Sequence, residues 1–512
     1  MKTRILYLAS LALLAMPAAA QETYENTKLI DNDLNGTARY VGMGGAMEAL
    51  GADISTISTN PAGVGLFRKS KVDGSLSITS QDKAKSFGNA SKTALNFDQL
   101  GFVYSMKQWG GSYLNFGFNY HKSRNFNNIL SAASALNNAS QNKLTYIKLS
   151  QGIVTSTDDL NYTQLDELYA NHLIYNEADK TVYNYLADAY TYNRGDKGYI
   201  GEYDFSVSGN LGNRWYLGLT VGIHDVHYNG YSEYVERLVE NPEQIGTMAV
   251  LDNRKITGTG FDVKVGAIFR PIESSPFRIG AYIHTPTFYN LTTSNYTVLT
   301  DGKDAFDMSE SLDFKVYTPW KFGFSLGHTV DNMLALGVTY EYADYGSIDS
   351  RVNDGEYYDS WNGTYYETSS SDKTMNSHTK RTLKGVHTLK VGGEVKVTPH
   401  LAVRAGYNYL SGMYNMNDGF KNGALYSQGS FYASQTDYTN WKNTNRLTCG
   451  IGYSIKNFNV DLAYQYSATK GEFHPFMDYY AAADSPADDN IASGVNVENN
   501  RHQFMMTIGY RF

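Results

Sequence analysis

The sequence predicts an all-β protein, a transmembrane antiparallel β-barrel of about 14 strands. The first observation is a strict two-residue alternation of apolar and polar side chains, which recurs along most of the chain. In the last such segment Phe504, Met506, Ile508, Tyr510 and Phe512 share one phase. Successive side chains of a strand point to opposite faces, so each segment has one apolar and one mostly polar face. Phe512 ends both this pattern and the sequence.

The connections between these segments are the second observation, because short turns alternate with long polar stretches. The short links fall at residues 107–111, 212–213, 271–276, 330–332, 398–400 and 456–457. Long loops are expected at about residues 81–95, 122–199, 229–256, 290–309, 344–381, 411–441 and 469–500. Such asymmetry is typical of bacterial outer-membrane barrels. Counting 309–329 as one strand despite Pro319 gives an even number of strands, about 14. The first strand then begins and the last strand ends on the short-turn, periplasmic side.

Residues 1–20 have the pattern of a secretory signal peptide. Lys2 and Arg4 precede an apolar run at 5–14, and three alanines at 18–20 precede Gln21. A signal peptide of this kind is cleaved from the mature protein, and its apolar run is too short to cross a bilayer. The mature chain is therefore expected to begin near Gln21.

The amino-acid composition narrows the class of protein further. The chain holds 43 tyrosines and 47 glycines against 10 prolines, and tyrosine suits the boundary between membrane and water. No later run approaches the roughly 20 apolar residues of a transmembrane helix. The net charge of −8 argues against nucleic acid as a partner. A single cysteine, Cys449, excludes an intramolecular disulfide framework.

Two regions do not follow the strand pattern. Residues 21–69 do not alternate and must lie either in the periplasm or inside the lumen, ahead of a barrel over 70–512. Within 122–199, Leu165, Leu168 and Leu173 fit helical spacing, and Leu186 ends a further apolar stretch. These leucines either pack on themselves or form a hydrophobic capture groove, and the residues alone leave both open.

Motifs for catalysis or cofactors are weak. The glycines at 42–45 lack the third glycine and the strand–helix–strand context of a dinucleotide site. His224 and His227 would face opposite sides of a strand, which makes them a poor metal clamp. We therefore expect no enzyme, no cofactor and no metal. The ions in the lumen phase have both signs and suit a wall network or a charged path: Asp262, Lys264, Arg270, Lys390, Glu394, Lys396, Arg404 and Arg446.

The most specific stretch runs from Gly42 through Asp53 to Asn60-Pro61-Ala62. It resembles the N-terminal hatch signature of the FadL/TodX family, outer-membrane transporters of long-chain fatty acids and aromatic hydrocarbons. The similarity extends through Tyr317-Thr318-Pro319-Trp320 and through 389–409.

The resemblance implies a 14-stranded barrel with residues 21–69 as a hatch in the lumen. Asn60, Pro61 and Ala62 would be structural parts of the gate, and Gly117 would be the candidate bend of a kinked third strand through which the ligand leaves sideways. It also shifts 122–199 toward hydrophobic capture by Leu165, Leu168, Leu173 and Leu186. The expected partners are a fatty acid-like molecule, outer-membrane lipids and the barrel assembly machinery, with the protein a monomer in a Gram-negative outer membrane.

The resemblance does not fix the ligand. The loops are longer and richer in Tyr and Asn than those of the fatty-acid transporters, and relatives with such loops are sometimes described as hemin receptors. A general porin and a surface adhesin acting through its loops stay as alternatives. Passive, gated uptake of hydrophobic molecules, with long-chain fatty acids first, is the leading expectation.

Overall fold

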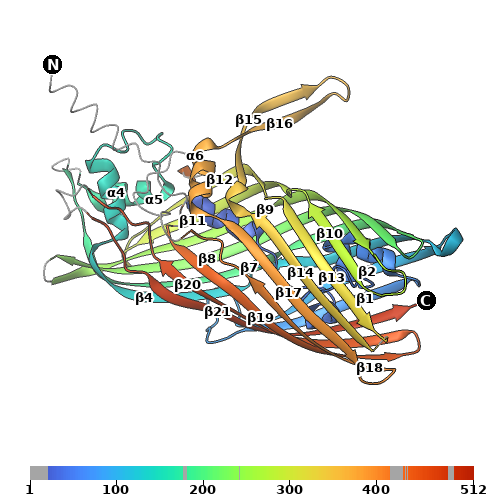
Figure 1. Cartoon of the computed structure of the whole chain (residues 1–512). Coiled ribbons are helices and arrows are strands. Elements are labelled where there is room, and N and C mark those ends of the chain that lie inside the picture. Colours follow the sequence, from blue (N-terminus) through green and yellow to red (C-terminus); the bar gives the residue numbers. More distant parts are fainter. Residues whose placement is uncertain are drawn as a thin grey trace, which may run out of the picture.

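The protein folds into one closed antiparallel β-barrel whose wall has 14 strands (Figure 1). The structure is a computed structural model, and it describes residues 21–176, 181–240, 243–331, 333–415, 431–432, 434, 436–481 and 489–512. The signal peptide predicted at 1–20 lies outside these residues. Within the described part of the chain, no helix is long and apolar enough to cross a bilayer.

Eight wall strands are single elements in the first and last parts of the wall. They are β1 (Lys71–Gln81), β2 (Thr93–Lys107), β7 (Leu186–Leu211), β8 (Trp215–Glu240), β9 (Glu243–Phe269), β19 (Tyr438–Ile455), β20 (Phe458–His474) and β21 (Val495–Arg511). β17 (Gly385–Lys396) and β18 (Leu401–Leu410) are also single.

The other four wall strands are interrupted. They are β3 with β4 (Tyr113–Asn125, Asn128–Ala139), β10 with β11 (Arg278–His284, Phe288–Thr300), β13 with β12 (Lys321–Val330, Ala305–Tyr317), and β14 with β15 (Leu334–Asp344, Asp349–Asp359). β9 pairs with both β10 and β11, and these pair with β13 and β12, so each interrupted pair fills one place in the wall. The prediction that 309–329 counts as one strand is confirmed.

The first and last strands close the barrel. β1 pairs with β21 from Lys71↔Arg511 to Gln81↔Arg501, and the backbone N–H of Phe512 donates to the Ser70 carbonyl at 3.0 Å. The alternation that ends at Phe512 therefore belongs to a strand that meets β1. The short turns are confirmed where they were predicted, for example between Leu211 and Trp215.

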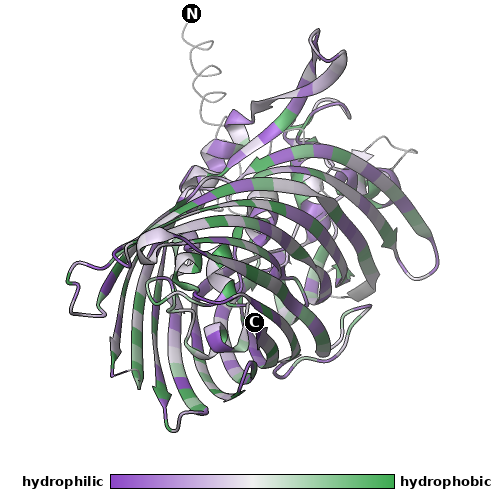
Figure 2. Cartoon of the chain, turned by 90° about the vertical axis from the view of Figure 1, so that its right-hand side faces the viewer, coloured by the Kyte–Doolittle hydropathy of each residue, from purple (hydrophilic) through white to green (hydrophobic). Residues whose placement is uncertain are grey.

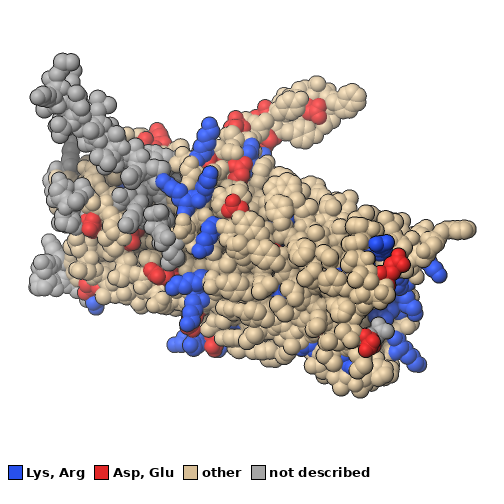
Figure 3. Space-filling view, in the orientation of Figure 1, with Lys and Arg blue, Asp and Glu red and all other residues tan. Residues whose placement is uncertain are grey.

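The outer surface is divided into charged and uncharged zones. On the face seen in Figure 3, Lys, Arg, Asp and Glu gather toward the two ends of the barrel, and between them lies a belt with almost none. Outward side chains in the wall include Phe102, Phe205, Leu219, Ile451 and Leu462, which are 44–54% exposed. Apolar and polar residues alternate along each strand (Figure 2). This is the surface of a barrel embedded in a bilayer.

Several predicted loops are parts of strands instead. Residues 229–256 form the outer half of the β8–β9 hairpin, which pairs without a long loop from Trp215↔Phe269 to Glu240↔Glu243. Residues 290–309 belong to β11 and β12. The predictions were wrong because strands that rise above the lipid need no apolar outer face. Both faces of such a strand can be polar, so its sequence shows no alternation of apolar and polar residues.

Residues 122–199 and 344–381 hold further ordered elements. The first contains β4, α4 (Gln141–Ser150) and α5 (Gln164–Tyr169) before β7. The second contains a hairpin of β15 and β16 (Thr364–Ser371), followed by α6 (Lys373–Thr382). The hairpin projects away from the wall (Figure 1). Parts of the loops predicted at 411–441 and 469–500 lie outside the described residues.

Residues 21–69 lie inside the barrel. They form α2 (Gln21–Ile30), α3 (Ala38–Gly42) and the 3-10 helices η1 (Ile54–Ser58) and η2 (Pro61–Leu66). α3 contacts β18–β21, and η2 contacts β7–β9 on another part of the wall. Each short helix begins at a side-chain cap: Thr37, Asp53 and Asn60 accept hydrogen bonds from Tyr40, Ser55 and Ala62. These contacts place α3 and η2 against inward residues of the wall, and a role of residues 21–69 as a hatch stays a prediction.

Candidate functional site: the occupied lumen

Glycines of the wall make room for the Asn60-Pro61-Ala62 turn. The Asn60 side chain accepts from the Ala62 N–H at 3.2 Å and donates to the Glu48 carbonyl at 3.0 Å. A Cβ at Gly266 would overlap Asn60, and a Cβ at Gly218 would overlap Pro61. The absence of these side chains lets the turn lie against the backbone of the wall.

Replacing Gly266 with Ala is therefore expected to destabilise the contact between residues 21–69 and the wall. The new methyl group must displace Asn60, which holds η2 in place. We expect faster proteolysis of the N-terminal segment in detergent, measured by limited digestion and mass spectrometry. Gly209→Ala is the matched control, because nothing lies within 4 Å of a Cβ at that position. Equal protection in both variants would contradict the tight fit.

One ion network ties α3 to the wall. Arg39 binds Glu394 of β17 through two hydrogen bonds of 2.9 Å each. Glu394 also accepts from Arg404 at 2.5 Å, and Arg404 reaches Asp461 at 2.6 Å. The lumen-phase ions Glu394 and Arg404 thus form the predicted wall network, which also holds the N-terminal segment.

A similar network surrounds Glu48, whose side chain is fully buried. Lys390 of β17 lies 2.9 Å from Glu48 and 3.0 Å from Glu341 of β14. Tyr40 and Thr339 donate to the Glu48 carboxylate at 2.9 and 2.7 Å. A buried carboxylate needs such partners, because an unpaired charge in this position is costly.

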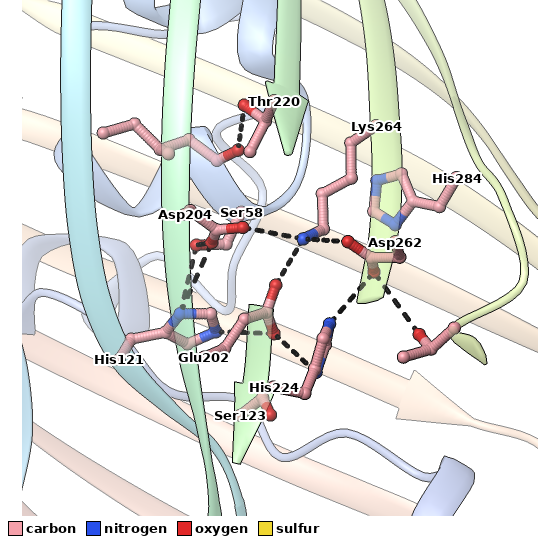
Figure 4. Close-up of polar contacts among 12 residues, drawn as sticks. Ser58, His121, Ser123, Glu202, Asp204, Thr220, His224, Asp262, Lys264 and His284 are labelled. Carbon is pink, nitrogen blue, oxygen red and sulfur yellow. Dashed lines mark hydrogen bonds and ion pairs between the residues drawn. The ribbon is translucent and has the colours of Figure 1, made fainter. Parts of the chain in front are cut away.

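A third network centres on Lys264 of β9 (Figure 4). Its ammonium binds Glu202 and lies 2.8 Å from Asp204 and 3.0 Å from Asp262. His121 and His224 flank the carboxylates, His224 with its Nε2 atom 3.2 Å from Asp262. The residues come from β3, β7, β8 and β9, and all are buried.

This third network also reaches the N-terminal segment. Ser58 of η1 donates to Asp204 at 2.5 Å and lies 3.1 Å from the Nδ1 atom of His121. His284 contacts the neighbouring Thr59 carbonyl at 2.6 Å. Two sets, His121-Glu202-Asp204 and Glu202-His224-Asp262, have ligand atoms close enough to share a cation. The Lys264 ammonium already lies among their carboxylates, so we interpret the arrangement as an ion-pair cluster rather than as a metal site.

Two cavities are lined by the chain at 31–35. One has a volume of about 170 Å³ and the other about 140 Å³. The larger cavity combines apolar and cationic groups: Leu410, Met413, Tyr414, Tyr438 and Trp441 with Lys28, Arg124, Arg446 and Arg501. Burial, with Arg194 acting in the same direction, lowers the pKa of the Lys28 ammonium to about 8. The smaller cavity reaches the Lys264 network.

The cations of the larger cavity differ in their partners. Arg124 pairs with Asp31 at 3.1 Å and with Asp33 at 3.4 Å. Arg446 donates to Asn408 at 3.1 Å, and Arg501 donates to Asn499 at 3.0 Å. Within the described residues neither Arg446 nor Arg501 forms an ion pair with a carboxylate. Asp33, which lines the same cavity, is the nearest acidic neighbour that influences both arginines, and their guanidinium N–H groups face the cavity beside it.

An apolar zone surrounds α2 beside these cavities. Tyr24, Leu29 and Ile30 of α2 pack in a cluster with inward residues of many wall strands. Tyr24 stacks on Tyr414 with ring centroids 4.8 Å apart and donates to Asn440 at 2.6 Å. The part of the lumen around α2 is therefore apolar, and the charged cavity lies next to it.

The leucines proposed for capture are mostly buried at the barrel rim. Leu165 and Leu168 belong to α5 and pack in a cluster with strand residues such as Tyr190 and Leu238, and Leu173 packs against its edge. Leu186 begins β7 and is half-buried. The positions match self-packing, and a capture role for them stays a prediction.

Gly117 lies within β3, and its role as a bend of the third strand stays a prediction. It pairs regularly with Val103 of β2 and Ser206 of β7. The register irregularity lies between Lys122 and Arg124. Gly117 accommodates Ile57, since a Cβ there would lie 2.8 Å from its Cδ1 atom. The larger interruptions are at 285–287, 318–320 and 345–348, in three neighbouring wall strands.

The wall, the uncharged belt and the occupied lumen define a transmembrane β-barrel filled by its own N-terminal segment. Its fold is that of a FadL homologue from Pseudomonas aeruginosa, with a TM-score of 0.52, 12% identity, and coverage of 94% of this chain and 100% of that chain. Two toluene transporters are also similar: TbuX of Ralstonia pickettii (TM-score 0.48, 14% identity, 94% and 99% covered) and TodX of Pseudomonas putida (0.49, 12%, 94% and 99%). No family model and no curated protein matches the sequence.

Proposed function

We propose that the protein takes up hydrophobic small molecules passively across the outer membrane of a Gram-negative bacterium, with long-chain fatty acids as the first candidate. Residues 21–69 act as the hatch, and Asn60, Pro61 and Ala62 belong to its gate. The FadL-like fold supports this proposal, and the larger cavity carries it. There apolar side chains adjoin Arg446 and Arg501, which donate to asparagine side chains and form no direct ion pair with a carboxylate among the described residues.

This mixed lining suits an acyl chain that ends in a carboxylate. Burial of an acyl chain contributes about 25 cal/mol for each Å² of apolar area removed from water. A guanidinium adds a charge-assisted hydrogen bond to the carboxylate. A purely apolar hydrocarbon would use only the first contribution, so the arginines favour an acid over a hydrocarbon or an alcohol of the same length.

The experiment compares oleate with oleyl alcohol, using purified protein and titration calorimetry. Wild-type protein is expected to bind oleate more tightly, because only the acid pairs with the arginines. The double substitution Arg446→Gln and Arg501→Gln should weaken oleate binding about 10-fold or more and leave the alcohol unchanged. Arg237→Gln is the control, because Arg237 is exposed and pairs with Asp188.

Uptake of radiolabelled oleate by a deletion strain provides the matching test in cells. Restoration by the wild-type gene and not by the double variant supports the proposal. Equal binding of oleate and oleyl alcohol by wild-type protein would contradict carboxylate recognition. Tighter binding of hemin than of oleate, with competition between them, would favour the hemin receptor instead.

A further inference from the structure

The hairpin of β15 and β16 leaves the wall at a defined point. β14 pairs with β17 up to Asp344↔Gly385. Beyond η5 (Tyr345–Ser347), β15 pairs with β12 only from Asp349 to Val352. From Asn353 onward, the described pairings of β15 are with β16 alone. The outer half of the hairpin is therefore a free two-stranded ribbon, which is rarely stable by itself in water.

Five aromatic side chains of this ribbon are exposed. Trp361 at the turn is 96% exposed, and the others are Tyr357, Tyr358, Tyr365 and Tyr366, at 49–66% exposure. Tyr358 contacts Tyr365 with ring centroids 4.9 Å apart, and Tyr357 pairs with Tyr366. Since neighbouring residues of a strand point to opposite sides, both faces of the ribbon are aromatic.

The ribbon lies outside the barrel beside the uncharged belt. In Figure 2, which looks along the barrel, it extends beyond the wall. In Figures 1 and 3 it leaves the wall near α6, at the edge of the belt, and projects away from the wall toward its tip.

The neighbouring helix α6 is basic on its outer side. Lys373, Lys380 and Arg381 of α6 and the following Lys384 are exposed, and Figure 3 shows Lys and Arg gathered over this helix. The opposite side of α6 faces the lumen, where Met375, His378 and Thr379 contact Thr23 of α2. The helix is thus fixed with its cations outward, at the edge of the belt.

We propose that the β15–β16 ribbon and the outer side of α6 form a binding surface for the anionic headgroup layer of the outer leaflet. The lysines of α6 pair with lipid phosphates, and the aromatic rings of the ribbon lie among the headgroups. Tyr and Trp favour that layer, because their rings are apolar and their polar atoms stay hydrated.

Two observations favour lipid over a protein partner. The rings project from both faces of the ribbon, whereas a docked protein would cover one face. The surface also starts at α6, on the border of the lipid-facing belt of the wall. Glu356 and Asp359 on the ribbon, together with its unpaired backbone edges, keep it in the hydrated layer and out of the hydrocarbon.

The test places one fluorescent label at a time on the full chain in lipid vesicles. Cys449, the only cysteine, is exposed on the wall and reports the hydrocarbon. Trp361→Cys and Thr157→Cys, each with Cys449→Ser, report the ribbon and an exposed rim loop. Quenchers are iodide in water, a nitroxide on the lipid headgroup, and a nitroxide on the acyl chain.

In vesicles of phosphatidylcholine with phosphatidylglycerol, the label at 361 should be quenched most by the headgroup nitroxide and be protected from iodide. The label at 157 should stay open to iodide. Replacing Lys373, Lys380 and Lys384 with Gln should lower the equilibrium constant for attachment about fivefold per lysine, and added salt should act in the same direction.

Iodide quenching at 361 that equals quenching at 157 would overturn the proposal. So would protection that is the same in phosphatidylcholine alone and is unchanged by the lysine substitutions. Protection that appears only when outer-membrane proteins or free polysaccharide are added would assign the surface to another partner. The wild-type lipid dependence decides the question even where the lysine variants fold poorly.

Discussion

Deleting residues 21–69 is expected to convert a closed barrel into an open pore. The wall closes through its own strand pairs, from β1 to β21, without the N-terminal segment. That segment fills the lumen and contacts opposite parts of the wall through α3 and η2. A barrel of this size has an interior wide enough for an aqueous channel once it is emptied.

The measurement is conductance in planar bilayers. The intact protein should show little steady conductance, and the deletion variant should show large, unselective channels. Deleting residues 354–363 of the β15–β16 hairpin is the matched control, because that segment lies outside the wall. Large steady conductance in the intact protein would contradict a closed lumen and favour a porin.

Substituting Lys264 with Met is expected to cost about 3–5 kcal/mol of the free energy of unfolding, because it leaves buried carboxylates without their cation. Lys264 binds Glu202, Asp204 and Asp262, and no other lysine or arginine within the described residues forms an ion pair with these three. Denaturant unfolding in lipid vesicles measures the loss. Lys255→Met is the control, because Lys255 lies on the same strand and is exposed.

The same variant gives a second readout. Removing the ammonium leaves His121, His224 and the carboxylates as ligand sets for a divalent cation. Added Zn²⁺ should therefore restore part of the stability of Lys264→Met, and have less effect on a variant that also carries His224→Asn. A Lys264→Met protein as stable as wild type would show that these carboxylates are solvated or protonated in the folded barrel.

The wall was predictable from short stretches of sequence. Phe504 to Phe512 reveal a strand by alternation alone, because the two faces of one strand meet lipid and lumen. The predicted strand number followed from the short turns and from counting 309–329 once. Residues 229–256 were mistaken for a loop, because above the bilayer the outer face of a strand can be polar.

The contacts of the lumen were less predictable. Asp262 and Lys264 were recognised as lumen-facing, but Glu202 and Asp204, which complete the cluster, were not. His224 was considered beside His227, its neighbour in sequence, whereas its contacts are Asp262 and Glu202. Gly117 was considered only as a bend, and the space that its missing side chain leaves for Ile57 was not predicted.

The sequence by itself determined the closed barrel that ends at Phe512, the lipid-facing phase of its last strands, and a distinct N-terminal segment containing Asn60-Pro61-Ala62. These are properties of residues close together in the chain. Only the tertiary structure decided that this segment lies in the lumen, which wall residues hold it, and that the β15–β16 hairpin leaves the wall. Such contacts depend on the stagger of strands and on the path of a returning chain, which bring together residues hundreds of positions apart and leave no local pattern.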